Sequence, residues 1–337
     1  GRTLLFPAAR SESEDAVKWL VESGLTVVVS DEQQSTPLHI AARYGGLEPL
    51  SFLIEKGAVV NSSDVTGTMP LHLAAERGHI VNVRHLVNKD ADIFARDNQG
   101  AYPLHRSMKY GHWGPAQFFI LRSVPVNALD NGKNTALHLA ALGGYQRIVK
   151  LLLNYGADFT RKNILGKTPL VVAMDAMNER VLLPEMTHQE RARYIGSRNT
   201  VFFLRGVVIS EYANAVKRND SGFIGQLIAA FPKYKDVMAY GKTPLYSAVQ
   251  INCTDVARLL LEHGANPDYP AITDNGMTPL HVVAKNGDED VARLLLEAGA
   301  SVSIHNADGE TPLDIANKYG RHAVAMLLQS VHPDVPE

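Results

Sequence analysis

The sequence predicts an all-α repeat protein, a solenoid built from helix–turn–helix repeats. The first observation is a constant period, because a Pro-Leu-His motif, preceded by threonine at Pro37, returns every 33 residues from Pro37 to Pro70 and Pro103. The second is the apolar spacing after each motif, which is typical of a further helix with one buried face. The third is that one repeat cannot bury its apolar side alone, so the repeats must stack.

The position of the motif's proline traces the repeats along the chain. After Pro103 this position is occupied by Ala136 and Pro169. The period is then interrupted between Pro169 and Glu211, after which the position is occupied by Glu211, Pro244, Pro279 and Pro312. Residues 3–10, TLLFPAAR, form a degenerate first repeat. We therefore predict one solenoid domain over 1–337, with repeats near 1–33, 34–66, 67–99, 100–132, 133–165, 166–207, 208–240, 241–275, 276–308 and 309–330 and a tail at 331–337.

The residue order within a repeat sets the order of its elements. Threonine caps the exposed N–H groups of a helix and proline fits its first turn, so each Thr-Pro pair opens a first helix. Leucine and two small alanines then face the neighbouring repeat, and a Val-x-x-Leu-Leu-Leu segment forms the second helix. Glycine ends this helix in the left-handed conformation, and Asp-x-x-Gly, as in residues 64–67 and 97–100, makes a turn.

The T-P-L-H-x-A-A core followed by V-x-x-L-L-x-x-G-A-D-x-N resembles the ankyrin repeat family over nearly the whole chain. The clearest repeats are KTPLYSAVQINCTDVARLLLEHGANPD at 242–268 and MTPLHVVAKNGDEDVARLLLEAGASVS at 277–303. The resemblance implies that the Asp-x-x-Gly turns are protruding hairpin fingers, that the solenoid has a concave face, and that the motif histidine forms hydrogen bonds within its turn.

Composition limits the classes of function. A net charge near −2 with 20% charged residues fits neither a basic nucleic-acid binder nor an acidic tail. The strongest apolar run, residues 201–209, is about half the length of a membrane-spanning helix and contains Arg205. A single cysteine and no signal-peptide pattern favour an intracellular, cytoplasmic or nuclear location. Because the chain begins at Gly1, we expect it to be a processed product or a piece of a longer protein.

Histidines recur at one motif position, which could suggest a metal-binding or catalytic array. Residues one repeat apart lie on layers roughly 10 Å apart, whereas metal ligands converge within about 2 Å of one ion. Asp314 takes the same position in the last repeat, which also fits a structural role. The histidines at this position are His39, His72, His105, His138 and His281.

The remaining chemical motifs predict no enzyme. Cys253 has no activating histidine at a known spacing, and the His188-x-Glu190 pair lacks the cysteine partners that a zinc deaminase needs. Phosphate-binding and nucleophile-elbow motifs do not occur in a supporting context. We therefore expect no catalytic residue, metal, cofactor or small-molecule substrate.

Residues that the repeat does not need are the candidates for binding. Six and seven residues after the proline position, at the end of each first helix, most repeats carry a cation and several carry a tyrosine. Cations here also suit the helix dipole, with a gain of about 0.3–1 kcal/mol each, but the tyrosines are not explained in that way. Tyr and Arg are enriched at binding hot spots, and an acidic or phosphorylated segment would suit the cluster. The predicted cluster is Arg43, Tyr44, Arg77, Lys109 and Tyr110.

A second candidate lies at the finger tips, where apolar residues replace the usual polar ones. Exposed apolar tips often mark contacts, although Val207 and Ile209 could instead pack against the inserted segment. The tips are Ile164, Leu165, Val207, Ile209, Tyr240 and Met277, of which we select Ile164, Leu165 and Tyr240 as partner-binding residues.

The sixth repeat is lengthened. From Pro169 to Glu211 there are 42 residues, which is one repeat of 33 plus nine. Thr187 to Glu190 has the form of a capping box, so an extra or extended helix should follow the break at Pro184. Such insertions are sites of specificity or neutral decoration. Two further extra residues lengthen the finger near Tyr269.

Three functions follow from these patterns. The favoured one is a scaffold that binds a partner protein as an adaptor, an inhibitor or an effector. The second is the recognition region of a larger enzyme, ligase or channel, supported by the apolar Leu4, Leu5 and Phe6 at the exposed end of the stack. The third is nucleic-acid binding by the basic and tyrosine-bearing stripe, which a pI near 6.7 disfavours.

Overall fold

The computed structural model describes residues 3–11, 13–179 and 187–331. Within these ranges the chain consists of α-helices joined by turns, together with one short 3-10 helix, Pro232–Tyr234. The described residues form no β-strand, and only an isolated bridge pairs Ala239 with Lys242. The predicted all-α repeat architecture is confirmed.

The chain divides into two compact parts, the N-terminal part, residues 1–203, and the C-terminal part, residues 204–337. The division falls within one helix, α12 (His188–Lys217). The predicted repeat limits and the single solenoid domain stay predictions, and each part is described by itself.

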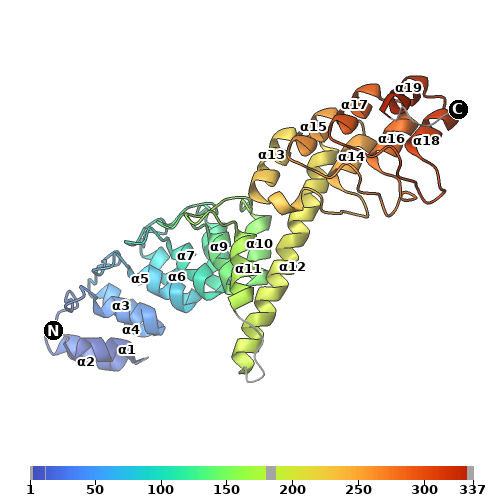
Figure 1. Cartoon of the computed structure of the whole chain (residues 1–337). Helices are drawn as coiled ribbons and strands as arrows, with labels where there is room; N and C mark the ends of the chain where they lie inside the picture. Colours follow the sequence, from blue (N-terminus) through green and yellow to red (C-terminus); the bar gives the residue numbers. More distant parts are fainter. Residues whose placement is uncertain (1–2, 12, 180–186, 332–337) are drawn as a thin grey trace. The chain divides into compact units, whose positions relative to one another are not determined.

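In the N-terminal part, first and second helices form two neighbouring rows (Figure 1). Successive first helices pack against one another, as do successive second helices, and the turns between repeats lie along one edge. The first helices are α1 (Leu5–Arg10), α3 (Pro37–Tyr44), α5 (Pro70–Arg77), α7 (Pro103–Tyr110), α9 (Ala136–Gly143) and α11 (Pro169–Glu179). The second helices are α2 (Glu14–Glu22), α4 (Leu47–Glu55), α6 (Ile80–Asn88), α8 (Trp113–Leu121) and α10 (Gln146–Asn154).

The C-terminal part repeats this arrangement after the end of α12. Its first helices are α14 (Pro244–Gln250), α16 (Pro279–Asn286) and α18 (Pro312–Lys318), which pack in sequence. Its second helices are α13 (Ser221–Ala230), α15 (Thr254–Glu262), α17 (Glu289–Glu297) and α19 (His322–Val331).

Local sequence explains where a first helix begins and ends. In α3, the Thr36 hydroxyl accepts a hydrogen bond from the His39 backbone N–H, and Pro37 occupies the first helical position. Gly45 ends the helix with a left-handed φ of 92°, which glycine adopts without steric cost. Leu38 and Ala41 between them are fully buried, and a buried leucine side chain contributes about 1.5–3 kcal/mol.

The lengthened repeat contains the predicted capping box. The Glu190 carboxylate accepts hydrogen bonds from the Thr187 backbone N–H at 2.8 Å and from its hydroxyl at 2.7 Å. These bonds lower the pKa of Glu190, and the helix that follows is confirmed. It is longer than expected, because α12 continues to Lys217 and includes the helix predicted around Glu211. The predicted break at Pro184 lies outside the described residues.

Two sequence interpretations were wrong at the residue level. Val207 and Ile209 lie half-buried within α12, so they are not finger tips. Met277 is also buried, with 9% of its surface exposed, and its backbone carbonyl accepts a hydrogen bond from the Ala271 N–H at the base of the turn. At the start of the chain Leu4 is exposed, whereas Leu5 and Phe6 are buried in the core and form no exposed apolar end.

Candidate binding surface

The recurring histidines hold their turns together. In each, Nδ1 accepts a hydrogen bond from the backbone N–H three residues earlier, at 3.1–3.2 Å. Nε2 lies 3.0–3.1 Å from a backbone carbonyl in the following turn, so Nε2 carries the proton and donates it. Both ring nitrogens are therefore occupied, and the predicted structural role is confirmed. Burial lowers the pKa of His39, His72, His105, His138 and His281.

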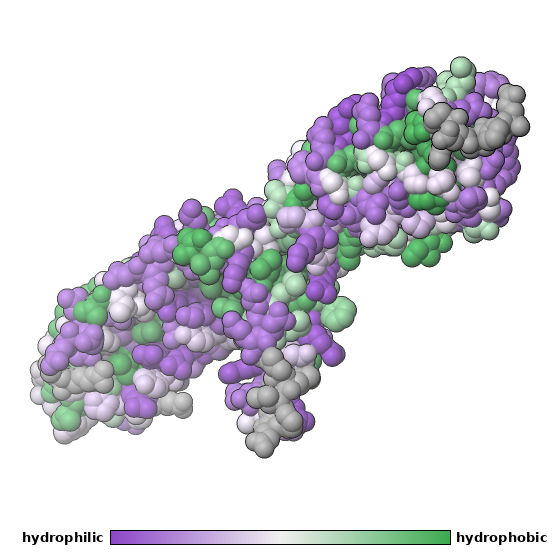
Figure 2. Space-filling model, viewed as in Figure 1, coloured by the Kyte–Doolittle hydropathy of each residue, from purple (hydrophilic) through white to green (hydrophobic). Residues whose placement is uncertain are grey.

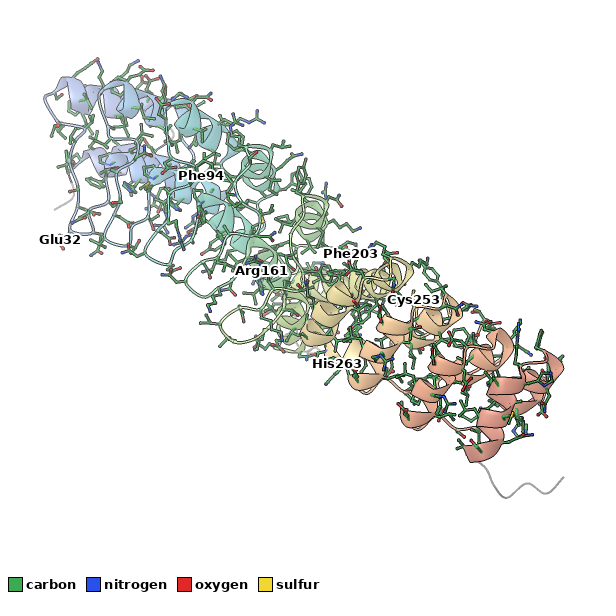
Figure 3. The ribbon with its side chains drawn as sticks, turned by 90° about the horizontal axis from the view of Figure 1, so that it is seen from above. Glu32, Phe94, Arg161, Phe203, Cys253 and His263 are labelled. Carbon is green, nitrogen blue, oxygen red and sulfur yellow. The ribbon has the colours of Figure 1, made fainter. Side chains whose placement is uncertain are left out.

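Among the described residues, the other reactive groups do not assemble into a metal-binding or catalytic centre. Over the described part of the chain, no three His, Cys, Asp or Glu side chains are placed to hold a metal ion. Cys253 is buried among the helices of the C-terminal part (Figure 3), and burial raises the pKa of its thiol. A raised pKa keeps the thiol protonated and therefore weakly nucleophilic.

The predicted cluster lies at the ends of three first helices that pack in sequence, α3, α5 and α7. Tyr44 and Tyr110 are 40% and 43% exposed, and Arg77 and Lys109 are exposed beside them. Cations also contact the tyrosine rings, with the Arg10 guanidinium 4.6 Å from the Tyr44 centroid and Lys109 Nζ 5.7 Å from that of Tyr110. We call Arg43, Tyr44, Arg77, Lys109 and Tyr110 the inner surface.

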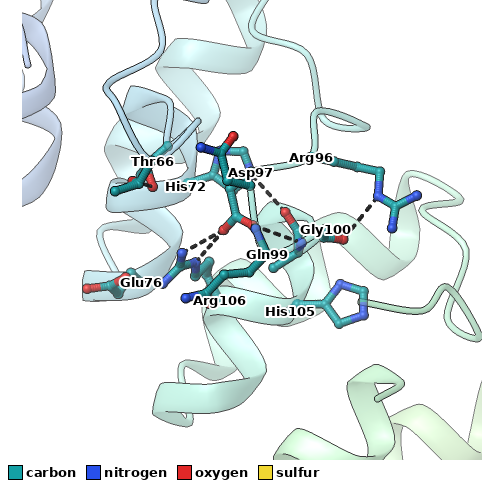
Figure 4. Close-up of polar contacts among 12 residues, drawn as sticks. Thr66, His72, Glu76, Arg96, Asp97, Gln99, Gly100, His105 and Arg106 are labelled. Atoms are coloured by element: carbon teal, nitrogen blue, oxygen red, sulfur yellow. Dashed lines mark hydrogen bonds and ion pairs between the residues drawn. The ribbon is translucent and has the colours of Figure 1, made fainter. Parts of the chain in front are cut away.

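A buried ion network lies beside the inner surface (Figure 4). Arg106 donates from Nε and Nη2 to Asp97 Oδ2 at 2.9 and 2.6 Å, and from Nη1 to Glu76 Oε2 at 3.2 Å. The exposed fraction of the side chain is 14% for Arg106, 0% for Asp97 and 12% for Glu76. The other Asp97 oxygen accepts the backbone N–H groups of Gln99 and Ala101. Arg106 therefore fixes the finger at 97–101 to α5 and α7.

Sequence reasoning missed Arg106. Its position in the first helix is held by Ile40, Leu73 and Leu139 in neighbouring repeats, so an arginine in LHRSMK departs from an apolar position. That departure was the available signal. An arginine there is tolerated because two carboxylates compensate its burial.

The network forms one wall of a hollow of about 560 Å³ between first helices and fingers. Arg43 and Tyr110 line this hollow together with Glu76, Arg106 and Gln99, whereas the other three residues of the inner surface do not. Nε of Arg43 is buried and has no hydrogen-bond partner in the described structure. Glu76 in the wall of the hollow is paired with Arg106, which also pairs with Asp97.

The selected finger-tip residues are exposed. Ile164 and Leu165 are 63% and 68% exposed and line a hollow of about 320 Å³ with Leu142 and Val172. Figure 2 shows apolar atoms on the otherwise hydrophilic finger side of the N-terminal part.

In the C-terminal part, Tyr240 is 82% exposed and lies next to Ile272, which is 74% exposed, on adjacent fingers. Tyr240 has a φ of 54°, a left-handed conformation that is unfavourable for an aromatic residue, and Lys217 Nζ lies 5.9 Å from its ring. Tyr269 in the lengthened finger is 41% exposed. No helix among the described residues is both long and apolar enough to cross a bilayer.

Comparison with known proteins agrees with the repeat pattern. The family described as ankyrin repeats (many copies) matches residues 53–107, 120–173 and 260–316, ankyrin repeats (3 copies) match 1–64, and a single ankyrin repeat matches 240–272. Ankyrin repeats are generally protein–protein interaction modules and are typically non-catalytic.

Two curated relatives match parts of the chain. The transient receptor potential cation channel subfamily A member 1 homolog of Caenorhabditis elegans is 54% identical over 43 residues, which is 13% of this chain and 4% of that protein. The neurogenic locus notch homolog protein 1 of Xenopus laevis is 32% identical over 132 residues, which is 39% of this chain and 5% of that protein. The aligned stretches are thus small parts of both relatives.

Proposed function

Because the chain belongs to the ankyrin repeat family, we propose that it is a non-catalytic scaffold that binds a partner protein or peptide through its inner surface. The observation that carries this proposal is the exposed Tyr and cation cluster beside a hollow whose finger is fixed by Arg106. A fixed finger reduces the ordering cost of binding. Finger tips Ile164, Leu165 and Tyr240 supply further contacts, and the cytoplasm or nucleus is the proposed location.

The charges favour an acidic or phosphorylated partner segment. Arg43, Arg77 and Lys109 form no ion pair with any described residue, whereas Glu76 on α5 is paired with Arg106. Arginine binds carboxylate and phosphate through parallel hydrogen bonds, and the exposed tyrosines add apolar area. The same surface would hold either anion.

A second proposal is that this surface is the recognition region of a larger enzyme, ligase or channel. Its support is that the aligned stretch makes up 4% and 5% of two long relatives, one of them named a cation channel homolog. Nucleic-acid binding by the same stripe is less favoured, because the net charge of the chain is near −2.

Affinity capture from a cell lysate tests the proposal that a partner binds at the inner surface. The native chain should retain a partner that the variant Arg43→Glu/Tyr44→Ala/Tyr110→Ala loses, since the variant reverses one charge and removes two aromatic anchors. The matched control is Lys285→Glu/Tyr319→Ala, which changes the equivalent residues of α16 and α18. Circular dichroism must show all three proteins equally helical.

Each outcome decides between the proposals. Loss of the partner in the inner-surface variant and retention in the control support binding at the inner surface. Retention in both variants contradicts it and leaves the finger tips as the candidates. If binding weakens steeply with salt and nuclease removes it, the ligand is a nucleic acid.

A further inference from the structure

Seven of the second helices named above fall into two groups, while α13 and α19 also lack the carboxylate pair that distinguishes them. In α2, α4, α15 and α17 the second and ninth residues are exposed carboxylates. In the three consecutive helices α6, α8 and α10 both carboxylates are absent. The acidic pairs are Asp15 and Glu22, Glu48 and Glu55, Asp255 and Glu262, and Asp290 and Glu297. They are replaced by Val81 and Asn88, Gly114 and Leu121, and Arg147 and Asn154.

The replaced positions leave a surface whose helices carry only positive charge. Helices α6, α8 and α10 contain Arg84, Arg147 and Lys150 and no carboxylate, and Arg122 follows α8 directly. None of these four cations forms an ion pair with a described residue. Asp90 and Asp92 after α6 line a separate hollow with Arg122, and Glu55 of α4 acts electrostatically on His85 of α6.

This surface is also apolar and hollowed. Val81 and Leu121 are 55% and 59% exposed. Between α6 and α8 lies a hollow of about 330 Å³. It is lined by the apolar residues Ile80, Phe118 and Leu121, by Gly114, and by the cations Arg84 and Arg122. A Cβ at Gly114 would lie 3.4 Å from Ile80 Cβ, an ordinary van der Waals contact, so a longer side chain at this position would extend into the hollow. The Arg122 guanidinium lies 3.9 Å from the Phe118 ring centroid.

We propose that this outer surface, defined by Val81, Arg84, Gly114, Leu121 and Arg122, docks an acidic segment of a partner protein. A bulky apolar side chain of the segment enters the hollow, and flanking carboxylates pair with Arg84 and Arg122. Stacking of the repeats does not require the change, because the acidic helices α15 and α17 stack equally well. The surface lies on second helices, so it is separate from the inner surface on the first helices.

Selection from a displayed library of random peptides of about 15 residues, long enough for several helical turns, tests this docking. Peptides selected on the native chain should share Asp or Glu beside a large apolar residue. Their affinity should fall about tenfold or more for Arg84→Glu/Arg122→Glu. It should fall similarly for Gly114→Leu, which fills the hollow without changing charge. The matched control Arg258→Glu/Arg293→Glu, at the Arg84 position of α15 and α17, should keep the affinity.

Other results overturn the proposal. Selected peptides that lack carboxylates, or that bind the Arg84→Glu/Arg122→Glu variant as well as the native chain, exclude an acidic docking segment. Binding to vesicles of phosphatidylcholine and phosphatidylserine, lost in this variant and without peptide binding, assigns the surface to a membrane. A native dimer that the variant converts to a monomer in analytical ultracentrifugation assigns it to a second copy. The inner-surface variant should leave peptide affinity unchanged, which separates this test from that of the scaffold.

Discussion

The second helices α6 and α8 of the N-terminal part differ from α15 and α17 of the C-terminal part mainly where they are exposed. At most buried positions both groups carry small or apolar side chains, such as Val83 and Leu86 in α6 and Ala257 and Leu260 in α15; Asn82 of α6, a buried polar residue, is an exception. At exposed positions α15 and α17 carry Asp, Arg and Glu, and Figure 2 shows a largely hydrophilic helix edge there. Stacking therefore dictates the buried residues, and departures at exposed positions point to requirements outside the repeat.

The largest expected effect is the loss of stability when a buried leucine common to α6 and α15 is truncated. Leu86→Ala and Leu260→Ala remove fully buried side chains at the same repeat position of α6 and α15. Each should lower the free energy of unfolding by about 2–5 kcal/mol, through lost burial and a residual cavity. Urea denaturation followed by circular dichroism measures both. A loss in one variant only would show that the two helices are not equivalent even where they are buried.

The second prediction compares a buried with an exposed ion pair. Arg106→Met leaves the Asp97 carboxylate, whose side chain has no exposure, without its cation and should destabilise the protein by about 3 kcal/mol. Lys318→Met breaks the ion pair with Glu310 in the C-terminal part, where the lysine is 57% exposed, and should have no measurable effect. Equal unfolding midpoints for both variants would contradict the structural role of the network.

Acidification should destabilise the N-terminal part more than the C-terminal part. It contains four of the buried motif histidines, whereas the C-terminal part has His281, with Tyr246 and Asp314 at the same position of other repeats. Burial lowers the folded-state pKa of the histidines, so their contribution is complete above about pH 6.5, the unfolded pKa. It is lost as the pH falls from there through the folded pKa. Asp314 stays charged, because its hydrogen bonds with Thr311 lower its pKa.

Hydrogen exchange measures this difference. Peptides from each part are compared at about pH 7.5 and about pH 5.5, after correction for the intrinsic exchange rate. Protection should fall more in the N-terminal part. The two tryptophans, Trp19 and Trp113, both lie in that part, so their fluorescence provides an independent unfolding signal. Equal loss of protection in both parts would contradict the histidine explanation.

The smallest effect concerns finger tips. Tyr240→Asn should stabilise the C-terminal part by about 1 kcal/mol, because asparagine tolerates the left-handed conformation better than tyrosine. Ile164→Asn on a finger of the N-terminal part has no positive φ to relieve and should leave stability unchanged. Thermal unfolding compares the two variants. A destabilised Tyr240→Asn protein would show that the ring contacts outweigh the backbone strain.

The fold could be predicted from the sequence because most repeats contain the same local signals. Thr-Pro at helix starts, glycine at helix ends and apolar residues at helical spacing each act within a few residues of one another. The lengthened repeat was only partly predictable. Its capping box is local, but the continuation of α12 through Val207 and Ile209 depends on helix propagation that no finger motif interrupts.

The candidate site could be predicted only in part, because some of its contacts join residues that are distant in the sequence. Helix-end residues such as Tyr44 and Tyr110 could be selected from their repeat position, and their exposure follows from it. The network of Arg106 with Asp97 and Glu76 could not, because Arg106 lies in the repeat after that of Asp97 and Glu76 and meets them only through stacking. The prediction that Met277 is an exposed finger tip was wrong for a related reason, because Met277 belongs to a finger sequence but is buried at the base of that finger.

Photo-crosslinking tests the central claim most directly, that recognition lies on the inner surface of the N-terminal part. A photoreactive phenylalanine analogue replaces Tyr110 in one protein and Tyr319, at the equivalent position of α18, in another. We predict a partner adduct from position 110 that Arg43→Glu abolishes, and no such adduct from position 319. Equal adducts from both positions, or an adduct at 110 that is insensitive to Arg43→Glu, would contradict the account.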